Sequence, residues 1–163
     1  MERYRFPTMS ILVATATIGI ASFATPVSAA PGYYTGVVGT ACAGVGTNAG
    51  KLNHQSNGAV YNKNTSTPAV INCPVPLEYN RATTVYVTWI KRDAGTLGCT
   101  FHRRSFNYLS GATSTQSTNA VGSSYFQFNA TTDYFNSVQC SIPKASGAGA
   151  NQQSGVNGIL WLN

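Results

Sequence analysis

The stretch GCTFHRRSF, residues 98–106, combines a cysteine, a histidine and two adjacent arginines on what alternation predicts to be a single strand. Two further cations lie just before the preceding turn. A basic cluster of this kind could meet an anionic polysaccharide, a lipid headgroup or an acidic partner protein. Alternatively, the charges protect an exposed strand edge from sheet-to-sheet aggregation. The candidate binding residues are Lys91, Arg92, His102, Arg103 and Arg104.

The same survey finds little that supports catalysis. Beyond residue 29 the acids are Glu78, Asp93 and Asp133, and the histidines are His54 and His102. A glycosidase needs two carboxylates about 5–10 Å apart, and all three acids fall in turn-like segments. A nucleophile-elbow motif is absent, and so few acids and histidines give poor support to a metal site. We therefore predict no catalytic residue, no metal and no cofactor.

Aromatic residues give a second lead, because exposed rings can serve β-sandwiches as stacking platforms for sugars. Phe126 and Phe128 alternate with Tyr125 and Gln127, so one side of that strand belongs to the core. Most of the rings are therefore predicted to pack in the interior. They are Tyr33, Tyr34, Tyr61, Tyr79, Tyr108, Tyr125, Tyr134, Phe126, Phe128 and Phe135.

The first 29 residues are typical of a secretory signal. Arg3 and Arg5 precede fourteen uncharged, mostly apolar residues, and Val27 and Ala29 suit the small-residue positions of a cleavage site. As a helix the apolar run would span about 21 Å, less than a hydrocarbon core of about 30 Å. We expect a cleaved leader, 1–29, and one secreted or periplasmic domain, 30–163. The alternative is an uncleaved membrane anchor.

The predicted mature domain is sparsely charged. Its eight Lys and Arg residues and three acids give a net charge of +5 for residues 30–163. Nucleic-acid binders usually carry far more basic residues, so nucleic acid is not an expected partner. No later apolar run approaches membrane-spanning length, and we expect no transmembrane segment after signal cleavage.

All four cysteines lie in this domain at wide spacings, without a Cys-x-x-Cys pair, which argues against a zinc knuckle. An even number in an exported chain predicts two disulfides, with three possible pairings. We favour Cys42–Cys73 and Cys99–Cys140, because the strands carrying each pair can lie side by side. Inward cysteines on neighbouring strands would then have Cα atoms about 5.5–6 Å apart.

Strand signals recur along the domain, and helix signals are nearly absent. The fold class predicted is all-β: an antiparallel β-sandwich or jelly roll of about eight strands, with a small barrel as the alternative. The polar segments 43–57, 109–120 and 144–155 are predicted to be loops. The predicted strands are 33–42, 58–62, 69–75, 83–92, 98–107, 121–129, 133–142 and 156–162.

Strands 83–92 and 98–107 are predicted to form a hairpin through the turn DAGTLG. His102 and Arg104 would face outward, and the hairpin would bring the basic residues together. The core face would carry Val85, Val87, Trp89, Cys99 and Phe101.

The order GAVYN, INCPVP, GTLGCTFH and YFNSVQCSIP, over about residues 40–143, resembles a group of small exported bacterial proteins. That group has a Cys-Pro strand, a Gly-Thr-Leu-x-Cys hairpin and a Cys-Ser-x-Pro strand. The resemblance implies a β-sandwich with Cys42–Cys73 and Cys99–Cys140 bridges. It transfers no catalytic residue to this chain.

These observations predict an exported, non-catalytic binding module of the periplasm or cell exterior. Its partner would be a glycan, an anionic surface or an envelope protein. One alternative is a structural subunit of a surface assembly made by edge pairing of strands. The other is a secreted enzyme with a site that the sequence does not reveal.

Overall fold

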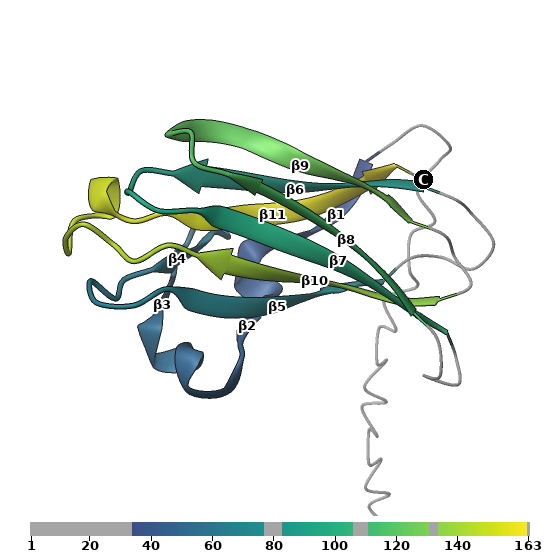
Figure 1. Ribbon diagram of the computed structural model, residues 1–163, viewed down its shortest axis with the longest axis horizontal. Helices are drawn as coiled ribbons and strands as arrows, with labels where there is room; N and C mark the ends of the chain where they lie inside the picture. Colours follow the sequence, from purple (N-terminus) through teal and green to yellow (C-terminus); the bar gives the residue numbers. More distant parts are fainter. Residues whose placement is uncertain (1–33, 77–82, 106–110, 131–133, 163) are drawn as a thin grey trace, which may run out of the picture.

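The computed structural model describes residues 34–76, 83–105, 111–130 and 134–162, which fold into two antiparallel β-sheets packed face to face (Figure 1). The all-β prediction is therefore confirmed. The predicted signal peptide, Glu78 and Asp133 lie outside the described residues. Within those ranges, no helix has the length and apolar character needed to cross a membrane.

Sheet A contains six strands, with β3, β4, β11, β6 and β9 in spatial order. β1 also pairs with β11, beyond the short stretch that pairs with β4. The strands are β1 (Tyr34–Val38), β3 (Leu52–His54), β4 (Val60–Asn62), β6 (Thr83–Lys91), β9 (Gly122–Ala130) and β11 (Gly155–Leu162).

Sheet B contains five strands in the order β2, β5, β10, β7 and β8. They are β2 (Ala43–Gly44), β5 (Ala69–Val75), β7 (Leu97–Ser105), β8 (Gly111–Thr118) and β10 (Tyr134–Ile142). Short 3-10 helices lie in the connections: η1 (Gly39–Ala41), η2 (Gly46–Lys51) and η3 (Ala150–Gln152).

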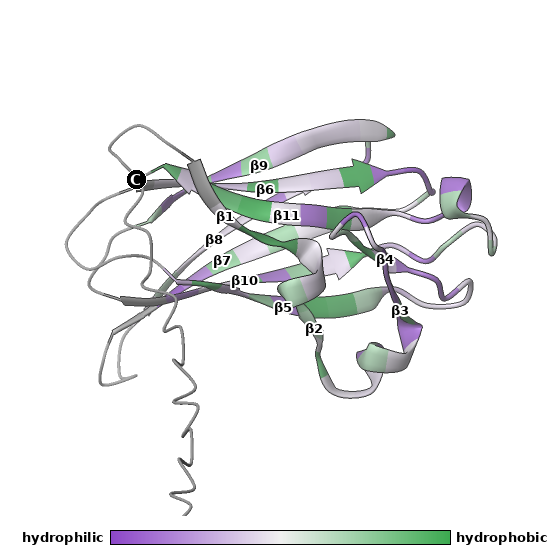
Figure 2. Ribbon diagram, turned by 180° about the vertical axis from the view of Figure 1, so that it is seen from behind, coloured by the Kyte–Doolittle hydropathy of each residue, from purple (hydrophilic) through white to green (hydrophobic). Residues whose placement is uncertain are grey.

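The core lies between the sheets because alternate residues of the central strands are apolar (Figure 2). Phe101 of sheet B stacks on Phe128 of sheet A, with ring centroids 5.7 Å apart and an interplanar angle of 18°. The removal of these apolar faces from water is the main favourable term in folding. On β6 the buried apolar residues are Val85, Val87 and Trp89.

The predicted hairpin of strands 83–92 and 98–107 is wrong. β6 pairs with β9 and β11 in sheet A, whereas β7 pairs with β8 and β10 in sheet B. Residues 92–96 therefore cross from one sheet to the other. The predicted facing is nevertheless confirmed, since Trp89 and Phe101 are both buried in the core. Because of this crossing, the apolar face of β6 and the apolar face of β7 pack against the same core from opposite sides.

Three strands, β2, β3 and β8, were predicted to be loops. β8 is the edge strand of sheet B, and its eight residues GATSTQST are mostly exposed on both faces. Such a strand has no buried face, so the alternation of apolar and polar residues that marks a strand is missing. Its threonines still favour extended backbone.

Gln116 of β8 closes one side of the sandwich. Its side-chain nitrogen donates to the carbonyl of Gln127 on β9, and its side-chain oxygen accepts from the Gln127 backbone N–H at 3.2 Å. β9 is the edge strand of sheet A. Gln116 therefore satisfies backbone groups that an open sheet edge would offer to another strand.

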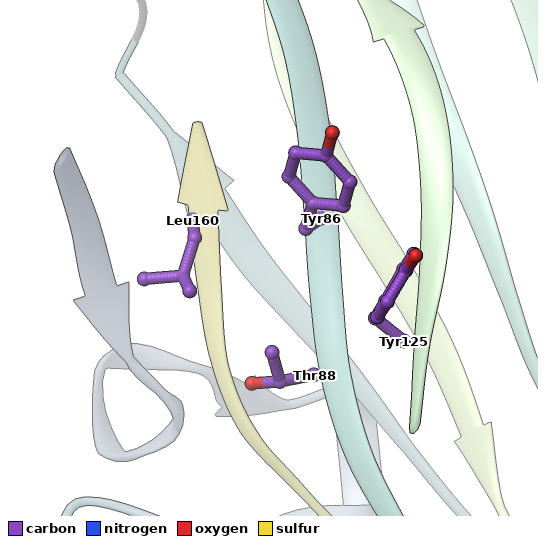
Figure 3. Close-up of a pocket in the computed structure, with 4 residues that line it drawn as sticks. All are labelled: Tyr86, Thr88, Tyr125 and Leu160. Atoms are coloured by element: carbon purple, nitrogen blue, oxygen red, sulfur yellow. The ribbon is translucent and has the colours of Figure 1, made fainter. Parts of the chain in front are cut away.

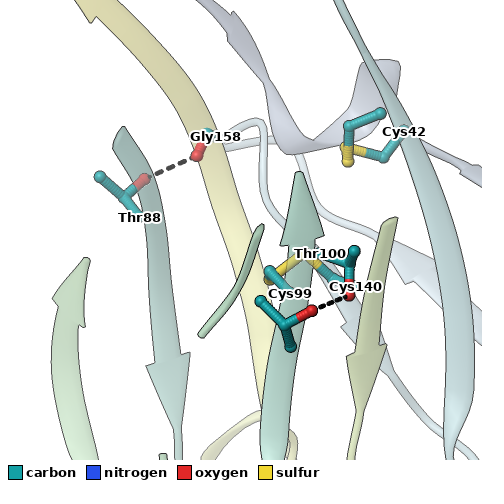
Figure 4. The surroundings of a disulfide bond; sticks show 8 residues. Cys42, Thr88, Cys99, Thr100, Cys140 and Gly158 are labelled. Atoms are coloured by element: carbon teal, nitrogen blue, oxygen red, sulfur yellow. Dashed lines mark hydrogen bonds between the residues drawn. A yellow bond between two sulfur atoms is a disulfide. The ribbon is translucent and has the colours of Figure 1, made fainter. Parts of the chain in front are cut away.

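The disulfide Cys99–Cys140 joins the neighbouring strands β7 and β10 of sheet B, and Cys42–Cys73 joins the residue just before β2 to β5 of the same sheet (Figure 4). This is the pairing favoured from the sequence. Cys99 and Cys140 are directly opposite in the register of β7 and β10, and their Cα atoms are 4.0 Å apart, closer than expected. Because both bridges act within sheet B, the packing of inner faces holds the two sheets together.

Replacing both members of one bridge, Cys99→Ala with Cys140→Ala, will lower the free energy of unfolding by about 4 kcal/mol. The two cysteines are 41 positions apart, and in the chain-entropy model a bridge over that distance strongly restricts the unfolded chain. Urea denaturation followed by tryptophan fluorescence measures the change. A loss below about 1 kcal/mol would contradict this estimate.

Gln116→Ala will lower the free energy of unfolding by about 1–2 kcal/mol, because two hydrogen bonds to the edge of β9 are lost. Gln127→Ala is the matched control, since it removes an exposed amide but keeps the backbone groups that Gln116 binds. It will change stability by less than about 0.5 kcal/mol. Equal urea midpoints for the two variants would contradict the role of Gln116.

Candidate functional site

The predicted basic cluster does not form a single surface, and its first member is buried. Lys91, at the end of β6, is 1% exposed. Its ammonium donates to the carbonyl of Asp93 at 2.7 Å and to that of Asn119 at 2.9 Å. Lys91 therefore ties the crossing segment to the turn between β8 and β9. The expectation that it belongs to an exposed cluster is wrong.

Asp93 anchors the same crossing to the segment that precedes β11. Its buried carboxylate accepts from the hydroxyl of Ser154 and from the backbone N–H of Ser146, both at 2.8 Å. The Ser154 oxygen in turn accepts from the N–H of Arg92 at 3.0 Å. These bonds hold the Gly-, Ala- and Gln-rich residues 144–155 in place and so fix the start of β11.

The other basic residues are spread over the molecule. The guanidinium of Arg92 donates to the carbonyl of Ala150. His102 and Arg103 are half-buried and lie roughly 15–20 Å along β7 from its first residue, at about 3.3 Å per residue. Arg104 belongs to β7, but its side chain lies outside the described residues. The cluster depended on the predicted hairpin, and it is lost with that hairpin.

A different surface, the outer face of sheet A, gathers exposed hydrophobic residues. Val38, Tyr125, Leu160 and Leu162 are four of the six exposed large hydrophobic residues in the described ranges, at 38–55% exposure. None of the described outward side chains of β1, β6, β9 and β11 is charged. The outward residues include Gly36, Val38, Thr84, Tyr86, Thr88, Ile90, Ser123, Tyr125, Gln127, Asn129, Leu160 and Leu162. Exposed apolar residues gathered on one face make it a candidate interaction surface.

A pocket of about 250 Å³ lies on this face (Figure 3). Tyr86 and Thr88 of β6, Tyr125 of β9 and Leu160 of β11 line it, and we call it the Tyr86–Tyr125 pocket. The strand register assembles it, because Tyr86 is opposite Leu160 and Thr88 is opposite Tyr125.

The two tyrosine rings of the pocket meet almost at a right angle. Their centroids are 5.2 Å apart and the interplanar angle is 83°, an edge-to-face arrangement that the ring quadrupoles favour. Figure 3 shows the Tyr86 ring face-on and the Tyr125 ring edge-on. Tyr125 is 55% exposed. The pair therefore presents a corner to solvent and not a flat platform.

Two backbone features position the side chains beside the rings. Leu160 leans away from the tyrosines (Figure 3), and a Cβ atom at Gly36 of β1 would lie only 2.6 Å from its Cδ2 atom. The absence of a side chain at Gly36 thus accommodates Leu160. The hydroxyl of Thr88 donates to the carbonyl of Gly158 at 3.0 Å (Figure 4), which fixes the orientation of that side chain.

The pocket offers contact and hydrogen bonding, not acid–base chemistry. It is lined by two phenol groups, one aliphatic hydroxyl and one leucine. In the described part of the chain, no group of three or more His, Cys, Asp or Glu residues could hold a metal ion.

This pocket was not predicted from the sequence. The alternation Val-Tyr-Val-Thr at residues 85–88 places Tyr86 and Thr88 on the side of their strand opposite the predicted core face of Val85 and Val87. Tyr125 and Leu160 come from strands far away in the sequence. Only the pairing of β9, β6 and β11 brings them to Tyr86.

No protein-family model and no curated protein matches the sequence. Among solved structures, the chain is similar to the CBM36-1 domain, a carbohydrate-binding module, of a multidomain xylanase from the hindgut metagenome of Trinervitermes trinervoides. The two are 9% identical, with a TM-score of 0.51 over 80% of this chain and 98% of that one. CBM35 from Paenibacillus barcinonensis is 12% identical, with a TM-score of 0.41 over 81% and 99%. At 9% identity, the first likeness establishes the β-sandwich fold alone.

Lys91→Met will lower the free energy of unfolding by about 2 kcal/mol, because two carbonyls in the crossing and the β8–β9 turn lose their buried donor. Lys144→Met, at an exposed lysine, is the matched control and will change stability by less than about 0.5 kcal/mol. Urea denaturation compares the two. Unchanged stability of Lys91→Met would contradict a structural role for Lys91.

Proposed function

We propose that this protein is an exported, non-catalytic glycan-binding module that holds its ligand on the outer face of sheet A. The observation that carries the proposal is the Tyr86–Tyr125 pocket, an uncovered aromatic corner on an uncharged face. A sugar presents C–H groups to an aromatic ring and hydroxyls to polar neighbours. The pocket supplies both kinds of partner, since a few polar groups in an apolar setting fix orientation.

The fold supports the proposal. The same β-sandwich is found in the carbohydrate-binding module of the multidomain xylanase described above. A fold can host many functions, so the site has to carry the functional argument. Here the pocket is the main evidence for glycan binding, and the fold is additional support.

Two other functions have less support. The pocket contains no acid, histidine or cysteine, so it offers none of the groups that usually serve as acid, base or nucleophile. A surface assembly built by edge pairing would need open strand edges, and Gln116 occupies part of the β9 edge.

Export is part of the proposal. Disulfides form and persist in oxidising environments such as the periplasm and the cell exterior. The two buried bridges of sheet B therefore support the predicted leader at residues 1–29 and a secreted or periplasmic location.

Tyr125→Ala will weaken glycan binding roughly tenfold or more, because it removes the most exposed ring of the pocket. Affinity gel electrophoresis measures the effect with soluble xylan, β-glucan and galactomannan, and pull-down measures it with insoluble cellulose and chitin. Circular dichroism will show the same β-sheet signal for the variant and the unmodified protein.

Two control variants show whether the lost affinity comes from the ring of Tyr125. Tyr125→Phe keeps the ring and will bind within about threefold of the unmodified protein, as expected if ring contact dominates. Val121→Ala trims a 69% exposed apolar residue outside the pocket and will bind unchanged. The proposal fails if no polysaccharide binds, or if Tyr125→Ala binds as tightly as Val121→Ala.

A further inference from the structure

We infer that the ligand is a single neutral glycan chain that seats one sugar residue in the Tyr86–Tyr125 pocket, and not the ordered surface of a crystalline polysaccharide. The inference rests on the proposed function, since it specifies the class of glycan for the same site. Three features of the pocket carry it: the angle between its rings, its size and its lack of charge.

The angle between the rings excludes flat stacking on both. A planar array of sugar rings can lie parallel to two aromatic faces only if those faces are coplanar, and Tyr86 and Tyr125 are inclined at 83°. One sugar residue can instead stack on one ring while its rim meets the other. The corner therefore fits a chain that approaches alone.

The size of the pocket suits one residue of that chain. Its volume of about 250 Å³ is below the roughly 300–1,000 Å³ typical of sites that enclose a drug-sized ligand. The oxygen of Thr88 gives the seated sugar a polar partner: it donates its proton to Gly158, so its lone pairs are left to accept from a sugar hydroxyl.

The charge distribution selects a neutral chain. The full sequence has a formal net charge of +6, yet no described outward side chain of β1, β6, β9 or β11, the strands that surround the pocket, is charged. Lys91 is buried, and His102 and Arg103 lie on β7 in sheet B. A uronic acid seated in the pocket would lose water around its carboxylate without gaining a cation, which is costly.

Three classes of probe test the inference on the full chain. Soluble neutral polymers are xylan, β-glucan and galactomannan; soluble acidic polymers are polygalacturonate and alginate; crystalline particles are microcrystalline cellulose and chitin. We expect at least one soluble neutral polymer to bind, with an affinity that changes less than about twofold between 0.05 and 0.5 M NaCl, because no exposed ion pair is involved. The acidic polymers and the particles will not bind above background.

Two variants connect binding to the pocket. Tyr125→Ala will lose roughly tenfold or more in affinity for the neutral polymer. Thr88→Val keeps the shape of the side chain but removes the acceptor oxygen, and it will lose about fivefold, the equivalent of one neutral hydrogen bond. Val121→Ala will bind unchanged. Unaltered binding by Thr88→Val would contradict the placement of the sugar beside Thr88.

The outcomes separate this inference from the proposed function. Binding to crystalline particles or to an acidic polymer, weakened by Tyr125→Ala, would overturn the inference and leave the glycan-binding face in place. Binding to none of the probes, or binding that Tyr125→Ala does not weaken, would overturn both.

Discussion

The packing of the two inner sheet faces against each other determines where every other feature of this molecule lies. Phe101 and Phe128 stack across the interface between the sheets, and the bridges of sheet B do not replace that packing. Because side chains alternate along a strand, a strand that buries Val87 must turn Tyr86 and Thr88 outward. A slip of one residue would exchange the two faces. The pocket on sheet A is thus a consequence of the core behind it.

Two of the chain's few charges hold segments in place. Lys91 and Asp93 are both nearly fully buried, and each is satisfied by backbone or hydroxyl partners, as buried charges require. They fix the passage between the sheets and the segment before β11. Since these charges hold the loops, the pocket on the outer face of sheet A can bind a ligand only through its shape, contact with its rings and its hydroxyl groups.

Alternation alone was sufficient to predict much of the fold. β5 was predicted at its observed bounds and β6 within one residue, because each has a buried face with a period of two. Alternation does not specify which strands pair, so β6 and β7 were wrongly joined and the basic cluster was wrongly assembled. Alternation also gives no signal for β8, because both faces of that strand are mostly exposed. The pocket needed the register of β9, β6 and β11, which no local pattern contains.

The most direct test of a ligand on the outer face of sheet A is an amide and tyrosine-ring NMR titration with a soluble neutral polysaccharide. The account predicts that the largest shift changes fall on Tyr86, Thr88, Tyr125 and Leu160 and on their neighbours in β6, β9 and β11. Changes centred on His102 and Thr115 of sheet B, or on the loops between the sheets, would contradict it.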